Sequence, residues 1–303
     1  MKATAIRAPR RAARYGAALT LLGLLWLPIA GRALTLLDDA GQTVTLPRTP
    51  TRIVSLAPGA TEMLFAAGAG SHVIATVQYS DEPQAARAVP RIGDSNAVDL
   101  ERLLTLHPDV VVFWPAGNSA AQVEKIRALH IPLYRQQINA LADIAPSLRR
   151  LGALADSRVT ADAAARAIES ELEMLRARFA ARRRVRVLLQ VWDHPIYTIG
   201  GTQPLSDALQ ICGAENVFAD LREAGPAVTV EAVVARNPDA IIAAAASDTA
   251  RAWLAEWRRF PSLRAVATES LLPLADPRLT RLGPSVLPAT QELCALIEQV
   301  RSR

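Results

Sequence analysis

The sequence lacks the short motifs that mark common classes of hydrolases and nucleotide-binding enzymes. It contains no G-x-S-x-G, no H-E-x-x-H and no phosphate-cradling glycine loop. Its four histidines and two cysteines do not form a set of ligands at metal-binding spacing. We therefore expect a binding protein without enzymatic activity, resident cofactor or structural metal.

The sequence also lacks an excess of charge once its first residues are set aside. The formal net charge is +5, but six basic residues and no acidic ones precede residue 34. The rest of the chain has 28 basic and 29 acidic side chains. A nearly neutral body gives no reason to expect nucleic acid or an anionic membrane as partner.

Only one long apolar run is present, and it lies at the start of the chain. A basic segment, MKATAIRAPRRAAR, precedes AALTLLGLLWLPIAG and a few small residues. This order is typical of a secretory signal peptide, and a run of about 15 residues is shorter than the ~20 needed to span a bilayer. We expect residues 1–33 to be cleaved and the mature protein to be periplasmic. A single membrane anchor is the alternative.

Cysteine is scarce, with only Cys212 and Cys294. In an oxidising compartment such an isolated pair predicts one disulfide, and two buried free thiols are the alternative. A bridge would close a loop of about 80 residues, for which chain entropy gives an upper estimate of roughly 4–5 kcal/mol.

What the sequence does contain is an alternation of helices with short apolar strands. In the first half, RIVSL, HVIATV, DVVVFW and IPLYR read as strands, and helical segments separate most of them. VRVLLQVW and DAIIAAA continue this pattern in the second half. Apolar strands between helices indicate an α/β fold with mostly parallel sheets, covered on both faces.

The alternation is interrupted by one long amphipathic helix, expected from about Thr160 to Arg183. Acidic residues fall in its first half and arginines crowd its end, as the helix macrodipole favours. About 24 residues of helix span ~36 Å, enough to bridge two domains. Its apolar stripe consists of Ala161, Ala165, Ile168, Leu172, Leu175 and Phe179.

One unit occurs twice, on either side of this helix. Residues 101–113 read ERLLTLHPDVVVF and residues 231–243 read EAVVARNPDAIIA. The repeat predicts two similar α/β lobes, residues 34–152 and 185–303, joined by one long rigid helix within 153–184. A cleft between two lobes is a common place for a small ligand.

The residues of both halves resemble a known family. RIVSLAPGATEMLFAAG, YSDEP, DLERLLTLHPDVVVFW, LSDALQICGAENVF and VEAVVARNPDAII are similar to the substrate-binding proteins of ABC importers that have a rigid helical linker. Within that family, Tyr79, Trp114 and the two cysteines resemble the members that bind vitamin B12 (cobalamin). The resemblance covers about residues 50–300 and implies capture of cobalamin, or a related corrinoid, by a protein that is monomeric when free.

The resemblance also implies roles for single residues. Glu101 and Glu231 take the positions of the acidic residues that dock onto the permease in the inner membrane, although each also suits the first turn of a helix. The ligand contacts that it implies are Tyr79, Trp114, Tyr197 and Asp276; Trp192 and Arg281 are further candidates because they lie near the presumed pocket and its rim. His194 is a candidate axial ligand for a bound metal, although a single loop histidine is usually not one.

The sequence departs from the cobalamin-binding members at two positions. Ser95 and Gly225 stand where those members have tryptophan. The departure leaves haem or an iron–siderophore complex as the alternative ligand, with the same fold and transport role.

Overall fold

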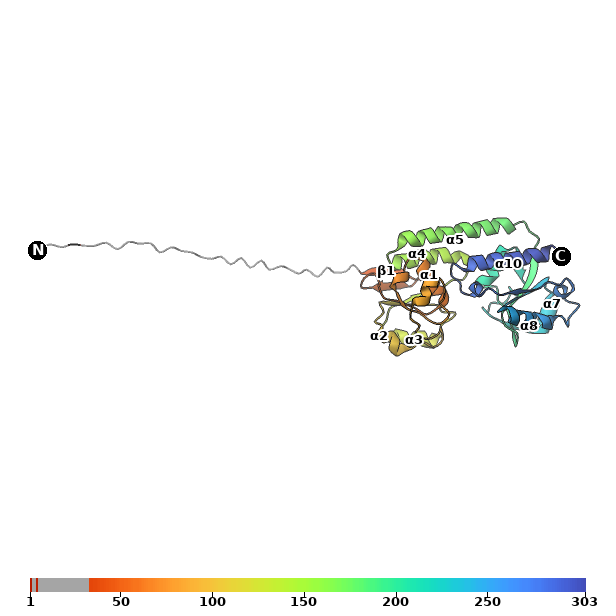
Figure 1. The fold of residues 1–303 in the computed structure, drawn as a ribbon, viewed down its shortest axis with the longest axis horizontal. Coiled ribbons are helices and arrows are strands. Elements are labelled where there is room, and N and C mark those ends of the chain that lie inside the picture. The colour runs from red at the N-terminus through yellow and green to blue at the C-terminus, as the bar shows by residue number, and fades with distance from the viewer. Residues whose placement is uncertain (2–3, 5–32) are drawn as a thin grey trace. The chain divides into compact units, whose positions relative to one another are not determined.

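The computed structural model describes residues 1, 4 and 33–303 of the chain. Nearly all of the expected signal peptide lies outside these described residues. No helix in the described part of the chain is long and apolar enough to cross a membrane. The described residues from 33 onward belong to one compact unit, which contains two parallel sheets (Figure 1).

The first sheet has four parallel strands in the order β4-β3-β5-β6. Ile53 and Val112 on its strands belong to one buried cluster, whereas Val54 and Val111 belong to another on the opposite face. Both faces are therefore covered, as the apolar strands predict. The elements of this lobe are the hairpin β1 (Leu34–Leu37) and β2 (Thr43–Leu46), β3 (Ile53–Ser55), α1 (Pro58–Ala66), η1 (Gly70–His72), β4 (Val73–Ala75), η2 (Gln84–Ala88), α2 (Leu100–Thr105), β5 (Val110–Phe113), α3 (Ala120–Ala128) and β6 (Leu133–Arg135).

The second sheet is also parallel, in the order β12-β11-β7-β9. Its helices and strands confirm the prediction of two similar α/β lobes. A two-stranded ribbon of β8 and β10 stands apart from it. The elements are β7 (Val185–Gln190), β8 (Ile196–Tyr197), α6 (Pro204–Ile211), β9 (Ala214–Asn216), β10 (Ala227–Val228), α7 (Val230–Arg236), β11 (Ala240–Ala244), α8 (Ser247–Trp257), α9 (Arg264–Ala267), β12 (Leu271–Leu274), η4 (Pro277–Thr280) and α10 (Val286–Arg301).

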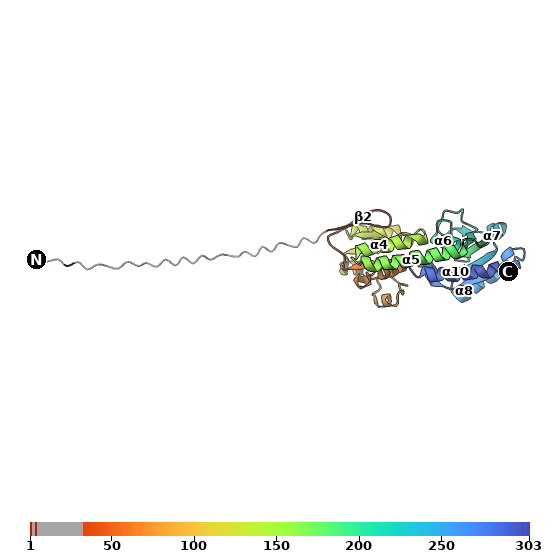
Figure 2. The ribbon, with the colours of Figure 1, turned by 90° about the horizontal axis from the view of Figure 1, so that it is seen from above.

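Helix α5 (Arg158–Phe179) runs along both lobes (Figures 1 and 2). Its buried residues are the six of the predicted apolar stripe. The expected end at Arg183 is wrong, because the helix stops at Phe179 and Arg182–Arg184 lie in the connection to β7. Helix α4 (Ile144–Leu154), preceded by η3 (Leu141–Asp143), packs along α5 and was not predicted. One buried cluster contains residues of α4, α5, α10 and both sheets, so the lobes share a core.

The repeated unit adopts the same local structure in both lobes. His107 and Asn237, 130 positions apart, both have left-handed backbone with φ of 44° and 43°. Asp109 accepts the backbone N–H of Arg52, just before β3, and Asp239 accepts that of Arg186, in β7, both at 2.9 Å. The repeat therefore fixes how helix and strand meet, and with it the place of the glutamate before them.

A second pair of equivalent carboxylates joins the lobes. Glu62 and Asp207 each stand six residues before a glycine with positive φ, at the end of α1 and α6. Glu62 accepts the backbone N–H of Ser285, the residue before α10, at 2.5 Å and its hydroxyl at 2.8 Å. Asp207 accepts the N–H of Leu141, the first residue of η3, at 2.9 Å. Glu62 of the first lobe thus caps the start of α10 in the second lobe, and Asp207 of the second lobe caps the start of η3 in the first.

We expect Glu62→Ala to lower the free energy of unfolding by about 2 kcal/mol, because it leaves a buried backbone N–H of Ser285 without its charged acceptor. Glu62 is only 6% exposed, and Gly59 beside it touches the carbonyl of Arg281 so closely that no side chain would fit there. Urea denaturation measures the change. Asp99→Ala, which removes a similar cap within one lobe, is the control and should cost about 1 kcal/mol.

Glu62→Gln separates the charge from the cap, since an amide oxygen still accepts the N–H. Burial raises the pKa of Glu62, and Glu82 adds to this, while Ser285 and Arg281 oppose it. The folded state therefore holds the proton more tightly than the unfolded state. The resulting contribution to stability is present below about pH 4.5 and is lost as the pH rises through the raised pKa. Glu62→Gln should remove this pH dependence of the free energy of unfolding. An unchanged pH profile in the variant would contradict the raised pKa of Glu62.

Candidate functional site

A hollow of about 370 Å³ lies between the two lobes. Residues from the carboxyl ends of the first sheet line one side, and the segment after β12 lines the other, which is where ligands bind in open α/β sheets. Tyr79, Trp114 and Arg281 are three of the expected contacts that the structure brings together here. The lining consists of Ala57, Pro58, Gly59, Ala60, Tyr79, Ser95, Trp114, Gln136, Pro277, Thr280, Arg281 and Leu282.

Tyr79 is held in an unusual conformation at this hollow. Its φ is 65°, a left-handed backbone that is strained for a bulky residue. Its side chain is nevertheless 75% exposed, so no core packing compensates for the strain. Residues with strained backbone cluster at active and ligand-binding sites, where the surrounding structure holds them in place.

Trp114 follows β5 directly, and its position is fixed from two sides. Its indole lies against Gly117, where a Cβ atom would come within 2.2 Å of the ring. Buried Asn118 accepts the N–H of Trp114 at 2.8 Å and donates to the carbonyls of Leu56 and Ser95, at 2.9 and 2.7 Å. Asn118 thus ties three loops of the hollow together. The sequence shows it only as one polar residue in PAGNS, so its role was not predicted.

A second hollow, of about 340 Å³, adjoins the first, and the two share Trp114 and Leu282. It too is lined from both sides of the interface. Its other residues are Pro115, Ala116, Arg135, Gln137, Ile138 and Asn139 from the first lobe, and Thr202, Gln203, Pro204 and Ala224 from the second. The cleft between the lobes therefore extends along both hollows.

Asp276 lies beside the first hollow but does not line it. Its carboxylate accepts the backbone N–H of Arg278 at 2.9 Å and is clamped by the guanidinium of the same residue at 2.5–2.9 Å. These hydrogen bonds hold the pKa of Asp276 below its usual value. Asp276 therefore shapes the turn that carries Thr280, Arg281 and Leu282, and its direct contact with the ligand stays a prediction.

The expected aromatic contacts of the second lobe lie outside the two hollows. The backbones of Tyr197 and Trp192 form an antiparallel β-bridge beyond the end of β7, and the two residues are 37% and 55% exposed. Trp192 also contacts Trp253, with ring centroids 6.0 Å apart. Both side chains offer apolar surface at the carboxyl edge of the second sheet, the same kind of edge that carries Tyr79 and Trp114 in the first.

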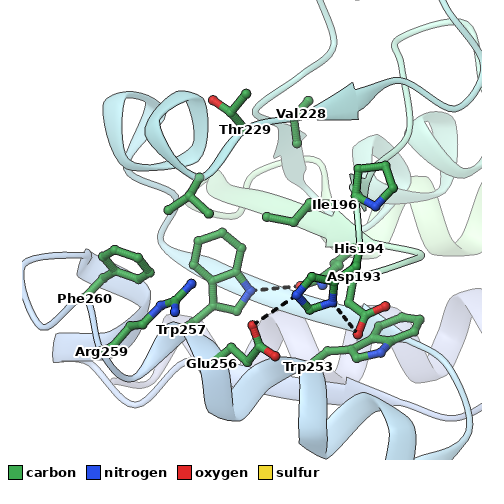
Figure 3. Close-up of a pocket in the computed structure, with 13 residues that line it drawn as sticks. Asp193, His194, Ile196, Val228, Thr229, Trp253, Glu256, Trp257, Arg259 and Phe260 are labelled. Carbon is green, nitrogen blue, oxygen red and sulfur yellow. Dashed lines mark hydrogen bonds and ion pairs between the residues drawn. The ribbon is translucent and has the colours of Figure 1, made fainter.

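His194 lines a separate pocket of about 290 Å³ in the second lobe (Figure 3). Its Nδ1 lies 3.0 Å from a carboxylate oxygen of Asp193, and its Nε2 lies 3.8 Å from one of Glu256. The aromatic rings of Trp253 and Trp257 stand nearby (Figure 3). Within residues 33–303 and the two described residues before them, no three His, Cys, Asp or Glu side chains are placed to hold a metal.

Glu101 and Glu231 occupy the same place in their lobes. Each is exposed in the first turn of its helix, α2 or α7, two residues after an N-cap side chain. The caps are Asp99 and Thr229, which accept the backbone N–H three residues on. Hydrogen bonds from its own backbone and from Thr229 lower the pKa of Glu231, so this carboxylate is charged at neutral pH.

The two cysteines form the expected disulfide. Cys212 at the end of α6 is bonded to Cys294 in the middle of α10, and both are buried. The bridge joins two helices of the second lobe and lies outside the residues that line the cleft.

Comparison with known proteins gives consistent results. Residues 53–272 match the family model described as periplasmic binding protein. The chain is 31% identical over 279 residues to a vitamin B12-binding protein of Vibrio parahaemolyticus, covering 92% of this chain and 98% of that protein. The crystal structure of the periplasmic vitamin B12-binding protein of Vibrio cholerae is 30% identical, covers 84% of this chain and 99% of its own, and has a TM-score of 0.75. A periplasmic haem-binding protein of Roseiflexus shares the fold at 20% identity, with 82% and 98% coverage and a TM-score of 0.70.

Proposed function

Because the chain belongs to the periplasmic binding protein family, we propose that it binds cobalamin in the cleft between its lobes and delivers it to the permease of an ABC importer. The observation that carries this proposal is the pair of adjoining hollows, with exposed Tyr79 on the wall of the first and partly buried Trp114 on the wall of both. A corrin is broad, flat and amphiphilic, and aromatic side chains with a few polar groups suit such a ligand. The similarity to vitamin B12-binding proteins supports the same ligand.

The residues have separate roles in this proposal. Tyr79, Trp114 and Arg281 contact the ligand in the first hollow, and Tyr197 and Trp192 extend the contact surface on the second lobe. Asp276 holds the turn of Arg281 in place. Glu101 and Glu231, one on each lobe, dock onto basic side chains of the permease. The protein performs no chemistry, and its N-terminal residues direct it to the periplasm.

Calorimetric titration of the mature protein, from Leu34 onward, tests the ligand. We expect tight one-to-one binding of cobalamin. Haem and a ferric siderophore are the comparison ligands, because Ser95 and Gly225 stand where cobalamin-binding members have tryptophan. Binding of haem but not of cobalamin would be consistent with the transport role and would refute cobalamin as the ligand.

Tyr79→Ala should weaken cobalamin binding by about 10- to 100-fold, because the variant loses the apolar contact between the tyrosine ring and the bound ligand. The free energy of unfolding should hardly change, since the side chain is 75% exposed and packs little. The same titration measures the affinity. Met174→Ala is the control, since it removes a 63% exposed apolar side chain from α5, away from the cleft. Equal affinities for Tyr79→Ala and the unaltered protein would contradict the placement of the ligand.

A further inference from the structure

The second hollow differs from the first in having two polar atoms without a partner. The Nε of Arg135, at the end of β6, and the Oε1 of Gln203, just before α6, are buried and make no hydrogen bond within the described part of the chain. One atom is a donor and the other an acceptor, and they come from opposite lobes. Unpaired buried polar atoms destabilise a fold, so their presence calls for an explanation.

Three other polar side chains of this hollow make hydrogen bonds within the protein. Gln137 donates to the side chain of Asn139 at 3.0 Å, and Thr202 donates to the carbonyl of Arg222 at 3.0 Å. No carboxylate is among the residues that line the hollow. The buried hydrogen-bonding capacity left open at this hollow is therefore that of Arg135 and Gln203.

The guanidinium of Arg135 is also free as a whole. Among the described residues its side chain has no hydrogen bond and no ion pair, whereas Arg150 is paired with Asp39 at 3.0 Å and Arg278 with Asp276 at 2.5 Å. A guanidinium presents five donors in a rigid fork that suits a phosphate, a carboxylate or a carbonyl oxygen. Arg135 thus places an uncompensated positive charge on the wall of the cleft.

We propose that the second hollow is the polar subsite of the cleft, where Arg135 donates to an anionic or carbonyl oxygen of the ligand and Gln203 accepts an adjacent N–H or O–H. This inference rests on the proposed function. Trp114 lies on the border of both hollows, so a ring held in the first hollow extends its polar arms into the second. Two parts of cobalamin match this chemistry: the phosphodiester with its ribose hydroxyl, and the primary amides on the corrin ring.

Titrating Arg135→Gln with cobalamin and with cobinamide, which lacks the nucleotide phosphate, tests the subsite and identifies the group it holds. We expect cobalamin to bind about 10- to 100-fold more weakly, the effect of losing a charge-assisted hydrogen bond. Unchanged affinity for cobinamide would assign Arg135 to the phosphodiester. An equal loss for both ligands would assign it to an amide. Unchanged affinity for both would overturn the proposal.

Two controls keep the result specific. Arg102→Gln removes an exposed arginine of the same lobe and should leave both affinities unchanged, so a general charge effect is recognised. Because Arg135 makes no bond in the fold, Arg135→Gln should not lower the free energy of unfolding. A loss of stability would indicate a structural role and overturn the proposal. If the unaltered protein binds neither corrinoid, the proposed function fails, and the same variant is then titrated with haem, whose propionates would meet the same donor.

Discussion

Reversing both docking charges, with Glu101→Arg and Glu231→Arg in one chain, should abolish uptake of cobalamin by cells and leave its binding to the purified protein unchanged. Both glutamates are exposed and stand at equivalent positions of the repeat, one on each lobe. Opposite charges at a fixed spacing determine the register of an interface, and like charges at the same places cost several kcal/mol. Neither residue lines the cleft, so the affinity for cobalamin should not change.

The variant should also fold. A basic residue in the first turn of a helix is unfavourable by about 0.3–1 kcal/mol at each position, which a two-lobed protein tolerates. Uptake of labelled cobalamin by cells that carry only the variant gives the functional result, and calorimetry gives the affinity. Glu173→Arg with Glu215→Arg makes the same change in net charge at exposed sites of α5 and β9. Uptake should persist in that control, and uptake in the docking variant would disprove the assignment.

Removing the disulfide should have the largest effect on stability. Cys212 and Cys294 are 82 residues apart in sequence, and closing a loop of that size restricts the unfolded chain by roughly 4–5 kcal/mol as an upper value. We expect Cys212→Ala with Cys294→Ala to lower the free energy of unfolding by about 3–4 kcal/mol, within the range observed for native disulfides. Guanidinium denaturation measures the loss.

Reduction provides the matched test. Dithiothreitol should destabilise the unaltered protein by a similar amount and leave the double alanine variant unaffected. Cobalamin affinity should be retained in the variant at a temperature where it is folded, since neither cysteine lines the cleft. A variant as stable as the unaltered protein would show that the bridge adds little beyond the packing of α6 against α10.

The main features of the fold were predictable because they depend on patterns that run over many residues. Apolar strands flanked by helices predicted parallel sheets with two buried faces, and the stripe of α5 predicted its buried side. Helix α4 was missed because Pro146 and Gly152 interrupt its sequence, although proline is tolerated in a first turn. The ribbon of β8 and β10 has two residues per strand, too few to show any period.

The site was predictable only in part, for reasons that differ between residues. Tyr79 and Trp114, which the resemblance implied, and Arg281, a further candidate, line one hollow. The contact of Asp276 with the ligand stays a prediction, whereas its pairing with Arg278 depends on the geometry of one turn, which no sequence pattern shows. Arg135 and Gln203 are far apart in sequence, and their lack of partners becomes visible only once both lobes are in place.

The crossed caps of Glu62 and Asp207, together with a core that continues through α5 and both lobes, have a consequence for transport. We expect them to hold Glu101 and Glu231 at one separation whether or not the cleft is filled. A permease that recognises only this separation cannot distinguish a loaded carrier from an empty one. Under the proposed function, empty carriers would therefore compete for the same receptor, and the ratio of carrier to vitamin, rather than the total amount of carrier, would limit the rate of import.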